Sequence, residues 1–111
     1  MPVTEYTPDE IFLSAPVTTR AIIKAGQSFP KYTPLMPDET DAASLVKWDG
    51  TPGKALAIAA KPVASGAEQS AVIYAAGGFR ISGINWPEAV TTDKAKRAAF
   101  LGSAIYVDDE A

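Results

Sequence analysis

Glycine and proline divide this chain into short segments. Eight glycines and nine prolines are spread over 111 residues, and the apolar or β-branched runs between them have the length of single strands. Proline cannot donate a hydrogen bond into the interior of a sheet, and glycine permits the backbone angles that turns require. The pattern predicts about eight short strands in one mostly β domain, an α+β fold with one short helix.

The strand prediction rests on β-branched and small apolar runs. We expect strands at residues 17–24, 45–48, 71–74 and 104–107, where such runs are bounded by turn residues. The alanine-rich run at residues 55–60 is interpreted as a buried return strand, because prolines on both sides limit it to strand length. A helix is the alternative there, since alanine is a good helix former.

Turn residues predict how these strands connect. Asp49-Gly50 supplies the positive φ of a tight hairpin between residues 45–48 and 55–60. Ala76-Gly77-Gly78 predicts a turn, after which a further strand begins at Phe79. Pro34 makes residues 32–36 an edge strand or a bend rather than a central strand.

One helix is expected near the C-terminal end of the sequence. Thr91 or Thr92 caps it, residues 94–101 form it, and Gly102 ends it. At helical spacing the inward residues are Ala95, Ala98 or Ala99, and Leu101.

The composition excludes several classes of function. The chain has no cysteine and no histidine, so it lacks disulfides, thiolate metal sites and the commonest general base near neutral pH. The net charge of −3 comes without a basic stripe, so we expect no nucleic-acid partner. Apolar runs are too short for a membrane span and no signal peptide is recognisable, so we expect no membrane association and synthesis in a cytoplasm.

Catalytic and ligand-binding motifs are also missing. Residues 50–55 resemble a phosphate-binding loop only superficially, because the glycine spacing and the hydroxyl after the lysine are wrong. Asp38, Glu39 and Asp41 lack the spacing and the glycine of a calcium loop, so we interpret them as solvated turn residues. We therefore expect no enzyme activity, no cofactor, no metal and no small-molecule substrate.

Residues 1–16 are expected to form an N-terminal arm, and residues 17–111 the folded domain. The arm is mostly polar and cannot bury enough surface alone to offset its ordering entropy. It is either a frayed terminus or a segment that becomes ordered on a partner. In the second case its partner-binding residues are Val3, Thr4, Tyr6, Ile11, Phe12 and Leu13. The alternative for residues 11–13 is that they fold back onto their own subunits.

Four residues are candidates for either the core or a subunit interface. They are Trp48, Trp86, Pro87 and Phe100. Aromatic side chains dominate the cores of small domains and are also enriched as interface anchors.

A family resemblance rests on a series of residues between positions 33 and 107. In chain order they are Thr33-Pro34-Leu35-Met36, Leu45-Val46, Trp48-Asp49-Gly50, Ala57-Ile58, Tyr74, Gly78-Phe79-Arg80, Trp86-Pro87-Glu88-Ala89, Lys96-Arg97, Ala99-Phe100, Gly102 and Ala104-Ile105. In this order and spacing, the chain resembles the head decoration proteins of lambda-like tailed bacteriophages. Residues 1–32 match the best-known members poorly.

The resemblance implies a structural role in the virion. Proteins of that family are β-clip-like and form homotrimers on the outer surface of the expanded head, at threefold and quasi-threefold positions. They bind the major capsid protein and stabilise the head against internal DNA pressure, after synthesis in the bacterial host cytoplasm. Their N-terminal arm becomes ordered against the capsid by strand addition. The alternatives are a β-clip ligand- or peptide-binding module of a cellular protein, and a trimeric β-clip enzyme resembling a nucleotide hydrolase, whose acidic motifs this sequence lacks.

Overall fold

The computed structural model describes residues 12–108. In this range the chain forms six strands, one α-helix and one 3-10 helix: β1 (Val17–Ile23), β2 (Pro34–Pro37), β3 (Ser44–Lys47), β4 (Ala57–Ala59), β5 (Gln69–Arg80), η1 (Ile81–Gly83), α1 (Asp93–Ala98) and β6 (Ile105–Asp108). The prediction of a mostly β domain with one short helix is confirmed. No helix in the described part of the chain is long and apolar enough to cross a membrane.

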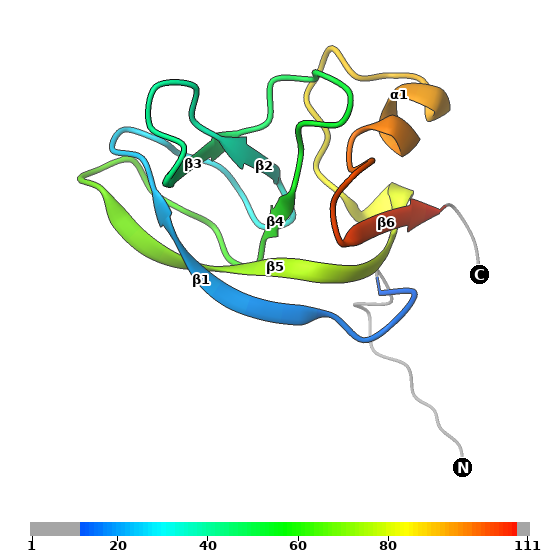
Figure 1. The fold of residues 1–111 in the computed structure, drawn as a ribbon, viewed down its shortest axis with the longest axis horizontal. Helices are drawn as coiled ribbons and strands as arrows, with labels where there is room; N and C mark the ends of the chain where they lie inside the picture. The colour runs from blue at the N-terminus through cyan, green and yellow to red at the C-terminus, as the bar shows by residue number, and fades with distance from the viewer. Residues whose placement is uncertain (1–11, 109–111) are drawn as a thin grey trace.

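Strands β1 to β5 close into a small barrel. The order of hydrogen-bonded neighbours is β1-β3-β2-β4-β5, and β5 pairs with β1 again to complete the ring. The long β1–β5 pair runs antiparallel from Val17↔Ala76 to Ile23↔Gln69, and β2, β3 and β4 lie across it (Figure 1). Closure leaves most strands with partners on both sides, which removes most of the exposed edges of so small a sheet.

Strands β2, β3 and β4 of the barrel are largely buried on both faces. Leu35 of β2 and Leu45 of β3 point into the barrel, whereas the next residues, Met36 and Val46, point outward into a second core. This alternation follows from the period of two in a strand, and it explains why these strands look like continuous apolar runs in the sequence. We call the interior group the barrel cluster, which comprises Ile23, Phe29, Leu35, Leu45, Ala57, Ala59, Val63 and Ile73.

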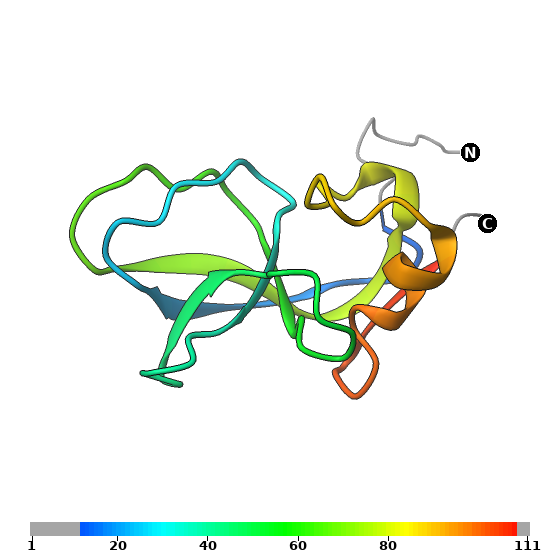
Figure 2. The same ribbon diagram turned by 90° about the horizontal axis from the view of Figure 1, so that it is seen from above.

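The second core lies between the outside of the barrel and residues 81–108, which we call the cap. Figure 2 shows the cap gathered around the C-terminal end of β5. The buried residues of this cap cluster are Met36, Val46, Trp48, Ala55, Ile58, Phe79, Ile81, Ile84, Val90, Ala99, Phe100, Ile105 and Val107. Strand β6 attaches the cap to the barrel by parallel pairing with the end of β5, from Gly77↔Ile105 to Arg80↔Asp108.

Helix α1 has the predicted N-cap residue but is shorter than predicted. The Thr92 hydroxyl accepts a hydrogen bond from the Ala95 backbone N–H at 3.1 Å, as an N-cap residue should. The helix ends at Ala98, well before Gly102, so helical spacing no longer applies to the residues that follow. Ala99 is fully buried, but the inward placement of Leu101 was wrong, because 66% of its surface is exposed.

The predicted hairpin between β3 and β4 was wrong. Asp49 and Gly50 do turn the chain, with φ of +100° at Gly50 and the Asp49 carboxylate accepting the Thr51 N–H at 2.9 Å. However, β2 lies between β3 and β4, pairing with both. The edge position expected for residues 32–36 was therefore also wrong. Pro34 is tolerated because it is the first residue of β2, where a missing N–H costs little.

The predicted turn at residues 76–78 is instead the interior of the longest strand. β5 continues through Gly77 and Gly78 to Arg80, so two predicted strands form one. The described residues contain six strands, against the prediction of about eight. A side chain on Gly78 would overlap the ring of Tyr106 from β6. The glycines therefore allow close approach of a neighbouring side chain here, instead of reversing the chain.

Candidate functional site

The segment that precedes β1 is attached to the end of β5. Phe12 lies opposite Phe79 in an antiparallel bridge, and the Leu13 N–H donates to the Gly78 carbonyl at 2.7 Å. In return, the Gly78 N–H donates to the Ser14 hydroxyl at 2.9 Å. Since Phe79 pairs with Val107 on its other side, β5 ends between the N-terminal segment and β6.

Phe12 is held by aromatic contacts within its own chain. Its ring is half-buried and meets Tyr74 and Phe79 edge-on, at centroid distances of 5.3 and 5.4 Å. Such edge-to-face pairs each add about 0.5–1.5 kcal/mol beyond the burial of area. Leu13 is also half-buried. The other predicted partner-binding residues, Val3, Thr4, Tyr6 and Ile11, lie outside the described residues, and the partner role of the whole set stays a prediction.

Tyr32 joins this aromatic group, which sequence reasoning missed. Its ring stacks with Tyr74 at 6.4 Å, and its backbone holds an unusual φ of +68°. The Tyr32 N–H donates to Ala59 at 2.8 Å and its carbonyl accepts from Asn85 at 2.9 Å, so this residue links the barrel to the cap. The positive φ of a tyrosine has no signal in the local sequence, so only the fold could reveal it.

The candidate anchors divide by burial. Trp48 and Phe100 are 3% and 2% exposed and belong to the core of their own chain. Trp86 and Pro87 are half-buried, and the Trp86 ring lies 6.1 Å from Trp48 and 6.3 Å from Phe100. The Trp86 indole N–H donates to the Ile81 carbonyl at 2.9 Å. An interface role for Trp86 or Pro87 stays a prediction, because each keeps an accessible side.

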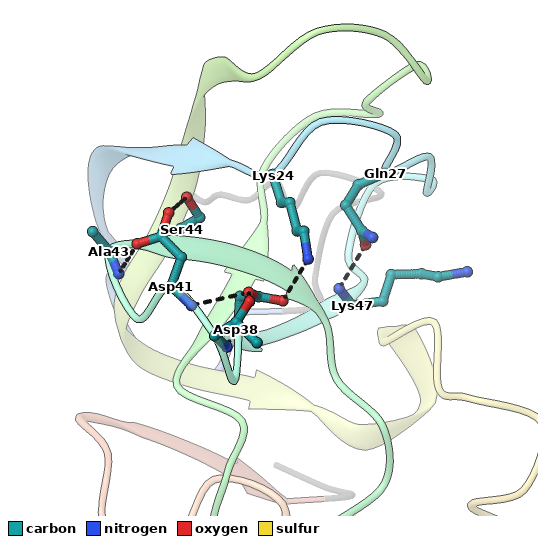
Figure 3. Close-up of polar contacts among 8 residues, drawn as sticks. Lys24, Gln27, Asp38, Asp41, Ala43, Ser44 and Lys47 are labelled. Atoms are coloured by element: carbon teal, nitrogen blue, oxygen red, sulfur yellow. Dashed lines mark hydrogen bonds and ion pairs between the residues drawn. The ribbon is translucent and has the colours of Figure 1, made fainter.

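The acidic loop between β2 and β3 is organised around Asp38, as Figure 3 shows. One carboxylate oxygen accepts the Thr40 hydroxyl at 2.7 Å and the Asp41 N–H at 3.0 Å, while the other is 3.1 Å from Lys24 Nζ. These contacts lower the pKa of Asp38 from 3.8 to about 2. The hydrogen bond from the Thr40 hydroxyl is the largest cause, and the hydrogen bond from Lys24 is the next.

These acids complete a turn rather than a metal site. The Asp41 carboxylate accepts the Ser44 hydroxyl at 2.9 Å and the Ala43 N–H at 3.2 Å, so its oxygens are also engaged by the loop. In residues 12–108, no group of three or more His, Cys, Asp or Glu side chains is placed to hold a metal ion.

Two clefts of about 380 and 370 Å³ mark the surface of the described residues. The first lies between the β2–β3 loop and the loops before β4 and β6, and Leu56, 38% exposed, lines it. The second contains Trp48, Trp86, Asp49 and Asn85. Two of its polar groups are paired within the fold: Asn85 donates to the Thr33 hydroxyl at 3.1 Å, and Asp49 accepts from the Thr51 N–H at 2.9 Å.

Comparison with known proteins identifies the family. Residues 4–106 match the model of the bacteriophage lambda head decoration protein D family, so the match extends into the N-terminal region beyond the residues 33–107 of the sequence resemblance. A protein of Escherichia phage N15 named "Putative decoration protein" is 42% identical over 81 residues, which cover 72% of each chain. Proteins of this family decorate the phage capsid and are structural rather than enzymatic. This chain belongs to the bacteriophage lambda head decoration protein D family.

Proposed function

We propose that this protein binds as a β-clip-like homotrimer to the outer surface of an expanded phage head, at threefold and quasi-threefold positions. Its partner is the major capsid protein, and its role is to stabilise the head against internal DNA pressure after synthesis in the host cytoplasm. The observation that carries the proposal is the family match over residues 4–106, because it includes both the folded domain and most of the proposed arm, residues 1–16.

The attachment of the N-terminal segment supports a role for the arm. An arm that binds a capsid can retain the domain there only if the arm is firmly attached to that domain. Here Phe12 is fixed against Phe79 and Tyr74, and Leu13 is hydrogen-bonded to β5. Residues before Phe12, including the candidate contacts Val3, Thr4, Tyr6 and Ile11, are thus linked to the barrel through a short and well-packed segment. Strand addition by the arm supplies affinity through backbone hydrogen bonds.

A trimer turns weak individual contacts into stable decoration. Once one arm of a trimer binds, the other two bind at high effective concentration, so the whole dissociates far more slowly than a single arm. Because the trimer binds the expanded shell and not its separated subunits, its binding free energy adds to the stability of that shell. A structural protein of this kind needs no catalytic group.

Co-sedimentation with DNA-free shells tests the proposal. We expect saturable binding to expanded shells, near one copy per capsid subunit, and none to unexpanded shells. Decorated shells should also disrupt at a higher temperature than bare ones. Absence of binding to either shell would contradict the proposal and favour a ligand- or peptide-binding module instead.

A truncation separates the arm from the domain. Removing residues 2–11 leaves the Phe12 contacts in place, so the variant should fold with an unchanged melting temperature and bind expanded shells more weakly. The matched control keeps the full length but replaces Val3, Tyr6 and Ile11 with serine. Equal binding by both variants and the natural protein would exclude the arm as the contact.

A further inference from the structure

The second surface cleft combines aromatic side chains with polar groups. Its volume of about 370 Å³ lies at the lower end of the range for small-ligand sites. Its lining comes from three segments far apart in the chain, residues 30–33, 47–49 and 85–88, so no local motif predicts it. We call it the tryptophan cleft, because both tryptophans of the chain, Trp48 and Trp86, line it.

Hydrogen bonds within the fold hold the inner part of the tryptophan cleft. Trp48 and Thr33 are 3% and 5% exposed. The Thr33 hydroxyl donates to the Pro30 carbonyl at 2.8 Å and accepts the side-chain amide of Asn85 at 3.1 Å. The Trp48 indole N–H donates to the Thr51 carbonyl at 2.7 Å. A ligand therefore meets a cleft that is already formed, which lowers the entropic cost of binding.

A backbone outlier lies in the segment that forms one side of this cleft. Tyr32 holds a φ of +68°, which is unusual for a bulky residue. It directly precedes Thr33, and its carbonyl accepts the Asn85 N–H at 2.9 Å. Outliers of this kind cluster at binding sites, where the surrounding structure holds them in place. The position of Tyr32 therefore agrees with a binding role for the tryptophan cleft.

Two charged side chains that line the cleft are available to a ligand. Within residues 12–108, the Lys47 ammonium and the Glu88 carboxylate form no hydrogen bond or ion pair, and both residues are exposed. Figure 3 shows the Lys47 side chain extending away from the acidic loop between β2 and β3. The Asn85 side chain donates to Thr33 and keeps its carbonyl oxygen and its second N–H for other partners.

We propose that the tryptophan cleft binds one ring of a neutral saccharide. A carboxylate only accepts hydrogen bonds and an ammonium only donates them, whereas a hydroxyl does both. A ring that carries several hydroxyls can therefore satisfy Glu88, Asn85 and Lys47 together. The C–H groups on the faces of such a ring suit the negative face of an aromatic side chain, which Trp86 supplies.

Other classes of ligand fit the tryptophan cleft less well. An anion such as phosphate would meet the carboxylates of Asp49 and Glu88 beside the single ammonium of Lys47. A wholly apolar ligand would leave these charges buried without partners. An extended peptide spreads its polar groups over about 3.3 Å per residue, so it suits a long groove better than a cleft of this size.

One ring in one cleft should bind weakly, with a Kd on the order of 1 mM. The inference does not depend on the proposed function. A decorated head, however, would carry many copies of the cleft, and many weak sites on one particle bind a repetitive saccharide with avidity.

An NMR titration of the free protein tests the proposal. The probes are glucose, galactose, mannose and N-acetylglucosamine. The chain has two indole N–H groups, and Trp86→Phe identifies the signal that belongs to Trp86. We expect at least one of the four sugars to shift the Trp86 indole and Asn85 side-chain amide signals saturably. Absence of a saturable shift with all four sugars would overturn the proposal.

A pair of acidic variants shows whether the sugar contacts the tryptophan cleft. Glu88→Ala removes an exposed carboxylate that has no polar partner within the described range, so the melting temperature should not change while sugar binding weakens about tenfold. Glu39→Ala, an exposed acid that lines the other cleft, is the matched control and should bind like the natural protein. Equal weakening by both variants would contradict a contact at Glu88.

Two further probes distinguish the class of ligand. A neutral proline-containing tripeptide and inorganic phosphate are titrated under the same conditions as the sugars. We expect neither to shift the Trp86 and Asn85 signals saturably. Saturable shifts with the tripeptide or with phosphate, in the absence of shifts with the sugars, would overturn the saccharide in favour of a peptide or an anion.

Discussion

The barrel cluster and the cap cluster are filled by different kinds of side chain. The barrel cluster is mostly aliphatic, with Phe29 as its one aromatic residue. The cap cluster contains Trp48, Phe79 and Phe100, and the half-buried rings of Phe12, Tyr32, Tyr74 and Trp86 pack against it. Inside the barrel, ladders space the strands regularly and aliphatic side chains fill most of the interior. Between the barrel and the cap only the β5–β6 ladder of the described residues sets the spacing, and large rings fill the rest of the gap.

The two clusters are nevertheless built on the same strands, β2, β3 and β4. Met36, Val46 and Ile58 belong to the cap cluster, while their sequence neighbours Leu35, Leu45 and Ala57 belong to the barrel cluster. A strand displaced by loss of one cluster would therefore disturb the other. We expect barrel and cap to unfold as one cooperative unit, as small single domains usually do.

The largest effect is expected at Phe79, where the cap, β5 and the N-terminal segment meet. Its side chain is fully buried and contacts Phe12 and Tyr74. Phe79→Ala should lower the free energy of unfolding by about 3–5 kcal/mol, because it removes a buried ring and leaves a cavity. Urea denaturation measures the change, with Phe79→Leu as a milder control. A loss below about 1 kcal/mol would show that the cap does not depend on this junction.

A slightly smaller effect is expected inside the barrel. Leu35 is fully buried in the barrel cluster, so Leu35→Ala should cost about 2–5 kcal/mol. Both tryptophans pack in or against the cap cluster, so fluorescence reports on the cap while far-ultraviolet circular dichroism reports on the strands. The two signals should change together in the natural protein and in Leu35→Ala. A dichroism transition that precedes the fluorescence transition would divide the molecule into two units.

Two adjacent glycines at the barrel–cap junction should behave differently. Gly77 has a φ of +127°, and an added Cβ would lie 3.0 Å from the backbone Cα of Pro16. Gly77→Ala should therefore cost about 1–3 kcal/mol in backbone strain and crowding. Gly78→Ala meets only the Tyr106 ring, which is 52% exposed and can rotate away. Thermal denaturation of the two variants gives the comparison, and equal losses would show that Tyr106 is as immobile as the Pro16 backbone.

The smallest effect on stability is expected at Asp38 in the loop between β2 and β3, and this effect depends on pH. Hydrogen bonds hold the pKa of Asp38 at about 2, below its ordinary 3.8. A depressed pKa in the folded state stabilises the fold above the unfolded-state value, and this contribution is lost as the pH falls through about 2. The stability advantage of the natural protein over Asp38→Asn should therefore shrink from pH 5 toward about pH 2. Glu39→Gln, an exposed neighbour, is the control. A pH-independent difference would show that the carboxylate charge has no part in it.

The sequence was most informative about the barrel strands and least about their order. Residues 17–24, 45–48 and 55–60 were recognisable because apolar residues between turn residues carry a local signal. The insertion of β2 between β3 and β4 depends on pairing between segments far apart, which no local pattern encodes. Likewise, Gly77 and Gly78 looked like a turn because the reason for them, Pro16 and Tyr106, lies elsewhere in the chain.

The geometry around the candidate residues could not be predicted from the sequence. Phe12 and Leu13 stood out as apolar residues in a polar N-terminal segment, and their partner-binding role stays a prediction. The rings that receive Phe12 could not be found from the sequence, because Tyr74 and Phe79 lie more than sixty residues away. The short pairing of β1 with β3, only at Ile22 and Ile23, was also invisible, because it depends on β3 beginning at Ser44.

The N-terminal segment contacts β5 at two places, the Phe12 bridge and the antiparallel β1 ladder from Val17 to Ile23, and this has a mechanical consequence. A force applied to the chain before Phe12, along the strand direction, acts on this ladder in shear. Hydrogen bonds loaded in shear share the force and must break together, whereas bonds that are peeled from one end break singly. The domain can thus hold a taut tether without unravelling from its first strand, and the Phe12–Phe79 contact is the point where the load enters.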